Sequence, residues 1–300
     1  MKRNKLTIIL LSFTLCFGFY IKADAQNGVF GSAYFQNQYV FNPAMSGLNA
    51  QEFNLNTAYQ SPFNSVPGGP RALYATADYG FNNQVGAGLS VINDKEGLFS
   101  NTRIAGTYSF HIKAGEQNQQ ISFGVSAVGI LERLNTYDIT GNPNDPLIYN
   151  FNNRSMQFET DLGAAYTDEK LTAQATLPNM VALFNKRERD VLEAQTLFVA
   201  VAYKVNLDDA DNGIAIEPKL AYRGYKDYQN VVDGGANVIF LKDVFSVYGM
   251  YHTSKSVSFG LGVKLLDAVQ LTAAYSTQTS ALQDFPLSTN FEVGLRYFVK

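Results

Sequence analysis

The strongest constraint on this chain is a period-two alternation of apolar residues with small or polar ones, which recurs from Glu52 to the C-terminus. In residues 85–91 the odd positions are Val, Ala, Leu and Val, and the even positions are Gly or Ser. Residues 197–205 and 257–265 follow the same period. Such alternation is typical of β-strands with one apolar face, whereas amphipathic helices repeat every 3.6 residues. The sequence therefore predicts an all-β fold.

Turn signals divide this region into about 14 candidate strands of roughly ten residues each. They are residues 53–59, 71–79, 84–92, 101–112, 119–133, 155–166, 170–177, 196–206, 213–225, 228–240, 244–252, 256–266, 269–278 and 289–299. Short connections alternate with longer ones, which are residues 60–70, 93–100, 134–154, 178–195 and 279–288. Bacterial outer-membrane barrels have short periplasmic turns and long outer loops. We therefore expect a transmembrane antiparallel β-barrel over residues 53–300.

Composition favours a membrane barrel over a soluble sandwich. Charged residues make up only 16% of the chain, which holds 22 Phe, 18 Tyr and 24 Gly. The mean hydropathy is −0.10. Beyond the first 21 residues, no apolar run approaches the length of about 20 that a membrane-spanning helix needs. The formal net charge of −3 argues against a nucleic-acid partner.

Charged residues of the predicted strands fall on the non-apolar face, because a charge at the bilayer midplane costs about 2–4 kcal/mol. We predict a polar network in the lumen, made of Asp78, Arg103, Glu159, Asp161, Glu217, Lys219, Arg223, Asp233, Lys264, Glu292 and Arg296. This network would be either a structural set of salt bridges or the lining of a path for ions or solutes. Fourteen strands enclose more room than side chains readily fill. Residues 26–52, 134–154 and 178–195 are the candidates to enter that space.

The N-terminus has the three parts of a secretory signal peptide. Basic residues precede an apolar stretch, residues 6–21, and Ala23-Asp24-Ala25 forms the cleavage motif. We predict that residues 1–25 are removed, together with the only cysteine, Cys16. An N-terminal segment, residues 26–52, then precedes the barrel and faces the periplasm or plugs the lumen.

The residues offer little for catalysis. The two histidines are His111 and His252, and no His, Cys and carboxylate cluster has metal-ligand spacing. Ser109 lies on the face of His111, at about 7 Å by strand geometry, which is too far for the serine–histidine pair of an acyl-chain hydrolase. We expect a protein without enzyme activity, metal or cofactor.

The stretch from Gln36 to Gly47 reads QNQYVFNPAMSG and is too specific for generic barrel sequence. It resembles the opening of the PorP/SprF family of Bacteroidetes outer-membrane proteins. The likeness continues through residues 69–71, 94–97 and 177–179 and the ending, residues 291–298. Two departures are Met45-Ser46 in the opening motif and a chain end of Val299-Lys300 in place of an aromatic residue.

The resemblance implies a non-enzymatic barrel of the type IX secretion and gliding apparatus. Its implied partners are a large secreted adhesin with a C-terminal sorting domain, other secretion components in the outer membrane and periplasm, and the lipid bilayer. The barrel would bind the adhesin for export or surface attachment. The implied partner contacts are the motif residues Gln38, Tyr39, Phe41, Asn42, Pro43, Ala44 and Gly47.

Two alternatives stay open. Asn42 before proline is pushed out of the α region, so the motif could be only a rigid lead-in to the first strand. A passive or hydrophobic-solute channel of the outer membrane would also suit 14 strands.

Overall fold

The computed structural model describes residues 31–62, 70–115, 118–135, 146–184, 195–207, 213–226, 229–265, 268–278 and 289–299. The predicted signal peptide, residues 1–25, lies outside them. No helix in the described ranges is long and apolar enough to cross a membrane.

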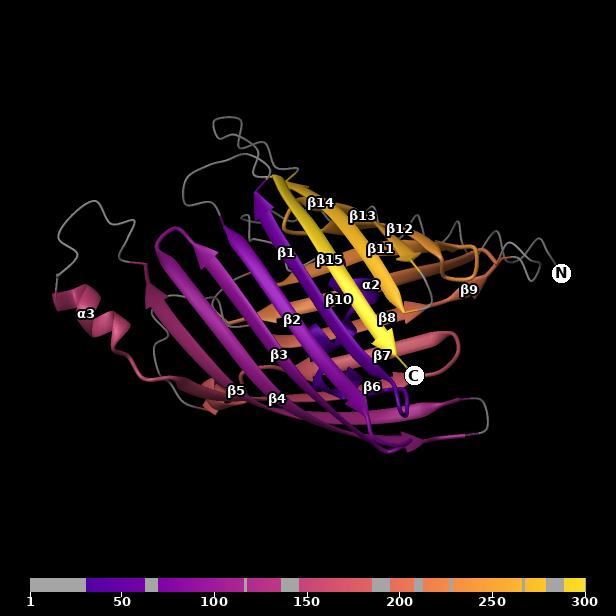
Figure 1. The fold of residues 1–300 in the computed structure, drawn as a ribbon, viewed down its shortest axis with the longest axis horizontal. Helices are drawn as coiled ribbons and strands as arrows, with labels where there is room; N and C mark the ends of the chain where they lie inside the picture. Colours follow the sequence, from indigo (N-terminus) through magenta and orange to yellow (C-terminus); the bar gives the residue numbers. More distant parts are fainter. Residues whose placement is uncertain are drawn as a thin grey trace.

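The described strands form one closed antiparallel barrel (Figure 1). They are β1 Phe53–Pro62, β2 Arg71–Gly80, β3 Val85–Glu96, β4 Phe99–Lys113, β5 Gln120–Leu134, β6 Gln157–Thr167, β7 Leu171–Leu177, β8 Gln195–Tyr203, β9 Val205–Asn206, β10 Ala215–Tyr225, β11 Val231–Phe240, β12 Phe245–His252, β13 Ser256–Leu265, β14 Val269–Gln278 and β15 Thr289–Val299. β15 pairs with β1, from Phe53↔Val299 to Pro62↔Asn290, and this pairing closes the ring.

β8 and β9 are two parts of one strand. Both pair with β10, and Lys204 interrupts the strand between them. Counted as one, they give 14 strands around the ring, in chain order. The predicted fold class is confirmed, with each predicted strand present.

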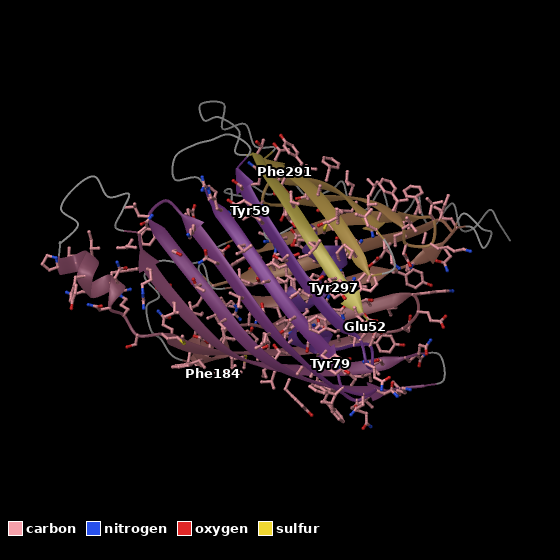
Figure 2. The ribbon with its side chains drawn as sticks, viewed as in Figure 1. Glu52, Tyr59, Tyr79, Phe184, Phe291 and Tyr297 are labelled. Carbon is pink, nitrogen blue, oxygen red and sulfur yellow. The ribbon has the colours of Figure 1, made fainter. Side chains whose placement is uncertain are left out.

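The side chains alternate between lipid and lumen as the period-two pattern predicts. On β4, Tyr108 and Phe110 are 51% and 38% exposed, whereas Ser109 and His111 between and beside them are fully buried. Figure 2 shows outward aromatic residues at two levels of β1, β2 and β15: Tyr59 and Phe291 near the upper end, and Tyr79 and Tyr297 near the lower. Aromatic girdles at two levels are typical of membrane barrels.

One predicted long loop is wrong. Residues 93–100 do not form a loop, because β3 and β4 continue until Glu96 pairs with Phe99. Gly97 turns the chain there with φ +57°, a left-handed conformation that glycine adopts without a steric penalty. β3 and β4 are therefore longer than the sequence predicted.

Of the three segments predicted to enter the lumen, only the first does so in the described residues. Residues 31–52, which we call the plug, cross the lumen with α2 Ala33–Gln36, η1 Gln38–Val40 and η2 Pro43–Met45 (Figure 1). Residues 146–154 stay outside: α3 Pro146–Asn152 is attached to the end of β5 by the Asn152 side chain, which bonds both backbone groups of Leu134. Residues 178–184, with α4 Met180–Phe184, reach only the rim, where the Ala182 amide donates to Glu159.

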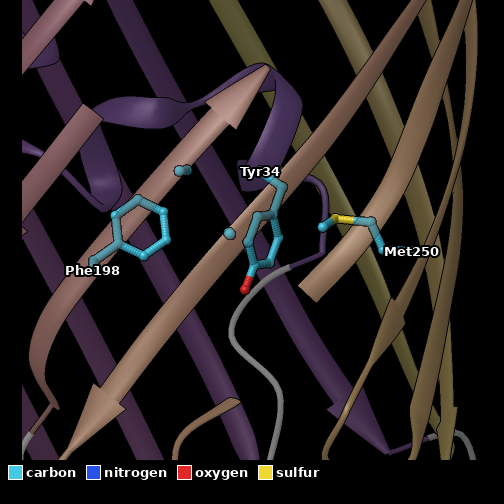
Figure 3. Packing of buried hydrophobic residues seen from close by; sticks show 5 residues of the cluster. Tyr34, Phe198 and Met250 are labelled. Carbon is cyan, nitrogen blue, oxygen red and sulfur yellow. The ribbon is translucent and has the colours of Figure 1, made fainter. Parts of the chain in front are cut away.

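The plug brings its own apolar core into a polar lumen. Tyr34 packs with Phe198, Ala200, Ala221 and Met250 of the wall (Figure 3). Phe41 of the plug stacks on Phe198, with ring centroids 4.9 Å apart and an interplanar angle of 13°. Apolar burial and polar contacts thus both hold this segment in place.

Candidate functional site

Asp233 on β11 joins the plug to a cluster of buried polar side chains of the wall. Its carboxylate accepts two bonds from Arg223, at 2.8 and 2.9 Å, and lies 2.6 Å from Nδ1 of His252. The Tyr34 hydroxyl of the plug donates to the same carboxylate at 2.5 Å. All four side chains are buried. The plug is therefore attached to a desolvated ion pair of the wall.

The start of the plug is held by three further predicted network residues. Glu292 accepts from the Gly31 amide at 2.9 Å and from the Ser32 hydroxyl. Lys219 donates to the backbone carbonyl of Tyr34. Arg296 donates to the Gln36 carbonyl at 3.5 Å and, on the wall, to Asn54 at 2.9 Å.

The family motif contacts the opposite side of the barrel. Tyr39 donates to Thr107 at 2.8 Å, and Gln174 donates to Gln38 at 2.7 Å. The Asn42 side chain accepts from the Ala44 amide at 2.9 Å and donates to the Ala164 carbonyl at 3.0 Å. Asn42 has extended backbone, φ −144° and ψ 116°, as the following proline requires. Most residues of the motif are buried against the wall.

Two wall glycines make room for this motif. Gly124 of β5 and Gly163 of β6 are direct partners in the sheet. A Cβ at Gly124 would overlap the backbone of Pro43 and Ala44, and one at Gly163 would overlap Asn42 and the Pro43 ring. The Asn-Pro-Ala turn therefore packs on bare backbone, which no larger residue would permit.

The end of the plug is held by residues of β2 and β4. The Gly47 amide donates to Asp78 at 2.9 Å. The Ser46 carbonyl accepts from Ser109 at 2.7 Å and lies 3.1 Å from Nε2 of His111. The expectation that Ser109 and His111 are too far apart is wrong: Oγ and Nε2 are 3.2 Å apart, because the two side chains lean together on the strand face.

The predicted polar network is divided between wall pairs and plug contacts. Seven of its eleven residues are buried: Asp78, Glu159, Asp161, Lys219, Arg223, Asp233 and Glu292. Arg103 pairs with Asp161 and also donates to Asn179 at 3.5 Å. Glu217, Lys264 and Arg296 line a cavity beside the plug. The plug occupies the centre of the lumen, where the sequence had suggested a set of salt bridges.

Asp233, His252 and Ser258 have the connectivity of a serine-hydrolase triad, since His252 Nε2 lies 3.0 Å from Ser258 Oγ. Sequence reasoning missed this group because its members lie on three different strands. However, Ser258 is 3% exposed and also bonds Ser276 at 2.8 Å. Plug residue Gly31 lies against it, and Asp233 is already shared with Arg223 and Tyr34. The arrangement anchors the plug and leaves no open approach to the hydroxyl.

In the part of the chain that the structure describes, no group of three or more His, Cys, Asp or Glu side chains could hold a metal ion.

Known proteins that match this chain include membrane barrels. The Acinetobacter baumannii outer membrane protein Omp33 is 11% identical, with a TM-score of 0.49, over 84% of this chain and 99% of that one. A mutant of the TodX monoaromatic hydrocarbon channel is 10% identical, with a TM-score of 0.46, over 92% and 95%. A mutant Rh. blastica porin is 10% identical, with a TM-score of 0.36, over 83% and 99%.

No curated protein matches the chain. The family model described as type IX secretion system membrane protein PorP/SprF matches residues 23–297. That match covers nearly the whole chain and confirms the resemblance seen in the opening motif. The protein belongs to the PorP/SprF family of type IX secretion system membrane proteins.

Proposed function

We propose that this protein is a non-enzymatic outer-membrane barrel of the type IX secretion and gliding apparatus that binds a large secreted adhesin. The adhesin's C-terminal sorting domain would be the bound part, for export or surface attachment. Family membership supports a place in the secretion apparatus, alongside its other outer-membrane and periplasmic components. The plugged lumen is the observation that favours binding over conduction.

The plug contacts strands on all sides of the ring. Its hydrogen-bond partners include Thr76 of β2, Ala164 of β6, Asp233 of β11 and Glu292 of β15. A passive or hydrophobic-solute channel would need a path past this segment. Releasing the plug would break these hydrogen bonds, which contribute about 0.5–1.5 kcal/mol each, or about 1.5–3 kcal/mol where one partner is charged. A barrel built in this way is better suited to hold a protein than to pass a solute.

The adhesin contact is proposed at the end that carries the long connections. Tyr149 of α3 and Phe184 of α4 are 69% and 79% exposed there; Phe184 is labelled in Figure 2. Both side chains are large and apolar and lie on segments outside the barrel wall, so a partner that covered them would remove apolar surface from water. The buried family motif, in this proposal, acts by fixing the plug, and it would meet a partner only once the plug moves.

The test is an affinity purification of the tagged barrel from outer membranes in mild detergent, followed by mass spectrometry. A large secreted protein with a C-terminal sorting domain should be recovered with it. Tyr149→Ser combined with Phe184→Ser should lower that recovery, whereas Leu207→Ser, which alters a residue 57% exposed at the opposite end, should not.

Recovery of the barrel alone, at normal expression, would contradict the adhesin proposal. Planar-bilayer conductance of the purified barrel would then decide for the channel: discrete conductance steps support it, and a silent bilayer leaves neither function supported.

A further inference from the structure

The outward-facing charges of the barrel wall gather in one place. Within the described strands, the charged side chains on the lipid face are Arg71 of β2, Lys95 of β3 and Arg133 of β5. Arg71 and Lys95 are exposed, and Arg133 is half-buried. All three are basic, and we call them the basic row.

The basic row crosses four neighbouring strands, β2 to β5 (Figure 1). Arg71 pairs with Lys95, Lys95 pairs with Ser100 of β4, and Ser100 pairs with Arg133. Arg71 begins β2 and Arg133 lies one residue before the end of β5, so the row stands at the end that carries the long connections. Outer-membrane barrels turn that end toward the outside of the cell.

The basic row has no acidic counterpart on its own face. Asp94, Glu96 and Glu132 are its neighbours in sequence, but they occupy the alternate strand positions and so lie on the lumen side. Among the described residues, no carboxylate forms a salt bridge with a member of the row. The Arg133 guanidinium donates to two backbone carbonyls, those of Glu132 at 2.8 Å and Arg154 at 3.2 Å. An anion from outside the chain would therefore meet three positive charges on this face.

A group of uncharged polar side chains adjoins the basic row. Asn93 of β3 and Thr102 of β4 pair directly, one outward position nearer the membrane centre than the row. The Asn93 side-chain amide donates to Thr102 at 2.7 Å and to Ser100 at 3.3 Å. Both hydroxyl groups are acceptors in these bonds, and neither donates to another group of the described residues. Each hydroxyl can therefore donate to an oxygen atom of a bound ligand.

Apolar side chains continue the same strand faces toward the membrane centre. Leu73, Val91 and Ile104 are all exposed there. A charge on the lipid face is tolerated near the interface with water and not at the membrane centre, so the basic row belongs at the level of the lipid headgroups. We propose that this face binds a phosphorylated glycolipid of the outer leaflet. Its phosphates would pair with the basic row, its sugar oxygens with Ser100 and Thr102, and its acyl chains with the apolar surface. This lipid site goes beyond the adhesin proposal and does not depend on it.

The test is native mass spectrometry of the detergent-folded barrel, which counts the lipids that stay bound. The probes are diphosphoryl lipid A, phosphatidylglycerol and phosphatidylcholine, titrated separately, with inorganic phosphate as a competitor. We expect diphosphoryl lipid A to bind most tightly, phosphatidylglycerol less tightly and phosphatidylcholine least. Inorganic phosphate at the same concentration should not displace lipid A.

Arg71→Gln combined with Lys95→Gln should weaken binding of lipid A about tenfold, as the loss of two ion pairs at an exposed surface would. Lys113→Gln combined with Lys170→Gln makes the same charge change on exposed residues at the opposite end of the barrel, and should leave the affinity unchanged.

Ser100→Ala combined with Thr102→Val removes the two hydroxyl donors. It should weaken lipid A and leave phosphatidylglycerol, which has no sugar, unchanged.

Equal affinity of the parent and the Arg71→Gln, Lys95→Gln barrel for lipid A would overturn the proposal. Equal binding of phosphatidylcholine and lipid A would overturn it in favour of unselective lipid contact, and displacement by inorganic phosphate would do so in favour of a free-phosphate site. Each variant is first shown to fold by its heat-dependent gel mobility, and Arg133→Gln replaces a double variant that fails. The adhesin purification is independent of this titration, so the two proposals fail separately.

Discussion

Replacing Asp233 by asparagine should loosen the plug and destabilise the barrel. The substitution keeps the shape of the side chain and removes its charge. Arg223, which is 1% exposed and donates two bonds to Asp233, would then keep its own charge without a counter-ion. Tyr34 and His252 would lose a charged partner at the same time.

The expected cost follows from the burial of the pair. Removing one member of a buried ion pair costs about 3–5 kcal/mol, because the other charge is left uncompensated. Tyr34→Phe removes only one hydrogen bond to a charged acceptor, at about 1.5–3 kcal/mol. Arg223→Met combined with Asp233→Leu removes both charges and should recover part of the stability lost in Asp233→Asn.

The free energy of unfolding can be measured by urea titration of the folded barrel. Far-UV circular dichroism and the mobility of unheated samples on SDS gels would follow the transition, since the chain has no tryptophan. Chymotrypsin would report release of the plug, which contains Tyr34 and Tyr39 but no lysine or arginine for trypsin. Asp243→Asn is the matched control, because Asp243 is 63% exposed in its pair with Lys204 and exposed pairs contribute about 0–1 kcal/mol.

The reasoning would be refuted if the free energies of unfolding of the Asp233→Asn barrel and the parent differed by less than about 1 kcal/mol. A buried arginine that loses its counter-ion should destabilise the barrel by more than that. An equal loss of unfolding free energy in Asp233→Asn and in Asp243→Asn would also refute it.

Three further predictions concern the plug and a turn. Gly124→Val should displace the Asn-Pro-Ala turn and increase chymotrypsin cleavage in the plug, whereas Gly106→Val, whose added atoms would meet little on the outer face, should leave cleavage unchanged. Deletion of residues 31–50 should raise planar-bilayer conductance; unchanged conductance of a folded deletion barrel would show that the plug does not block the lumen. Hydrogen bonds from the amides of Leu171 and Lys170 lower the pKa of Asp168. A lowered pKa means that the carboxylate stabilises its turn above the pKa of the unfolded chain, and that this stabilisation is lost as the pH falls through the folded pKa. The protection factors of those two amides against hydrogen exchange should therefore fall at acid pH, and Asp168→Asn should abolish that dependence.

The strands could be predicted from the sequence because the side chains on one face of a strand recur every two residues. Residues 257–265 predicted β13 almost to the residue, since Val, Phe and Leu alternate with Ser and Gly between clear turns. The limit appeared where a strand continues through polar residues: Lys95 and Glu96 resemble a loop in sequence, yet they pair with Ser100 and Phe99.

The site was only partly predictable. The sequence pattern predicted that the charged residues of the strands lie on the non-apolar face, but it could not say which of them meet. Asp233 and His252 are direct cross-strand partners, and Ser258 comes from the next strand, β13. The Ser109–His111 bond was missed because side-chain lean, which strand spacing does not include, brings the two groups together.

By itself, the sequence determined an all-β membrane barrel, its strand number and its family, because these follow from local alternation and a continuous motif. Only the tertiary structure decided that residues 31–52 fill the lumen, that Gly124 and Gly163 form the floor beneath Asn42 and Pro43, and that Tyr34 reaches Asp233. Such contacts join residues up to 261 positions apart. They depend on how the ring closes and on the stagger of its strands, and no local pattern specifies either.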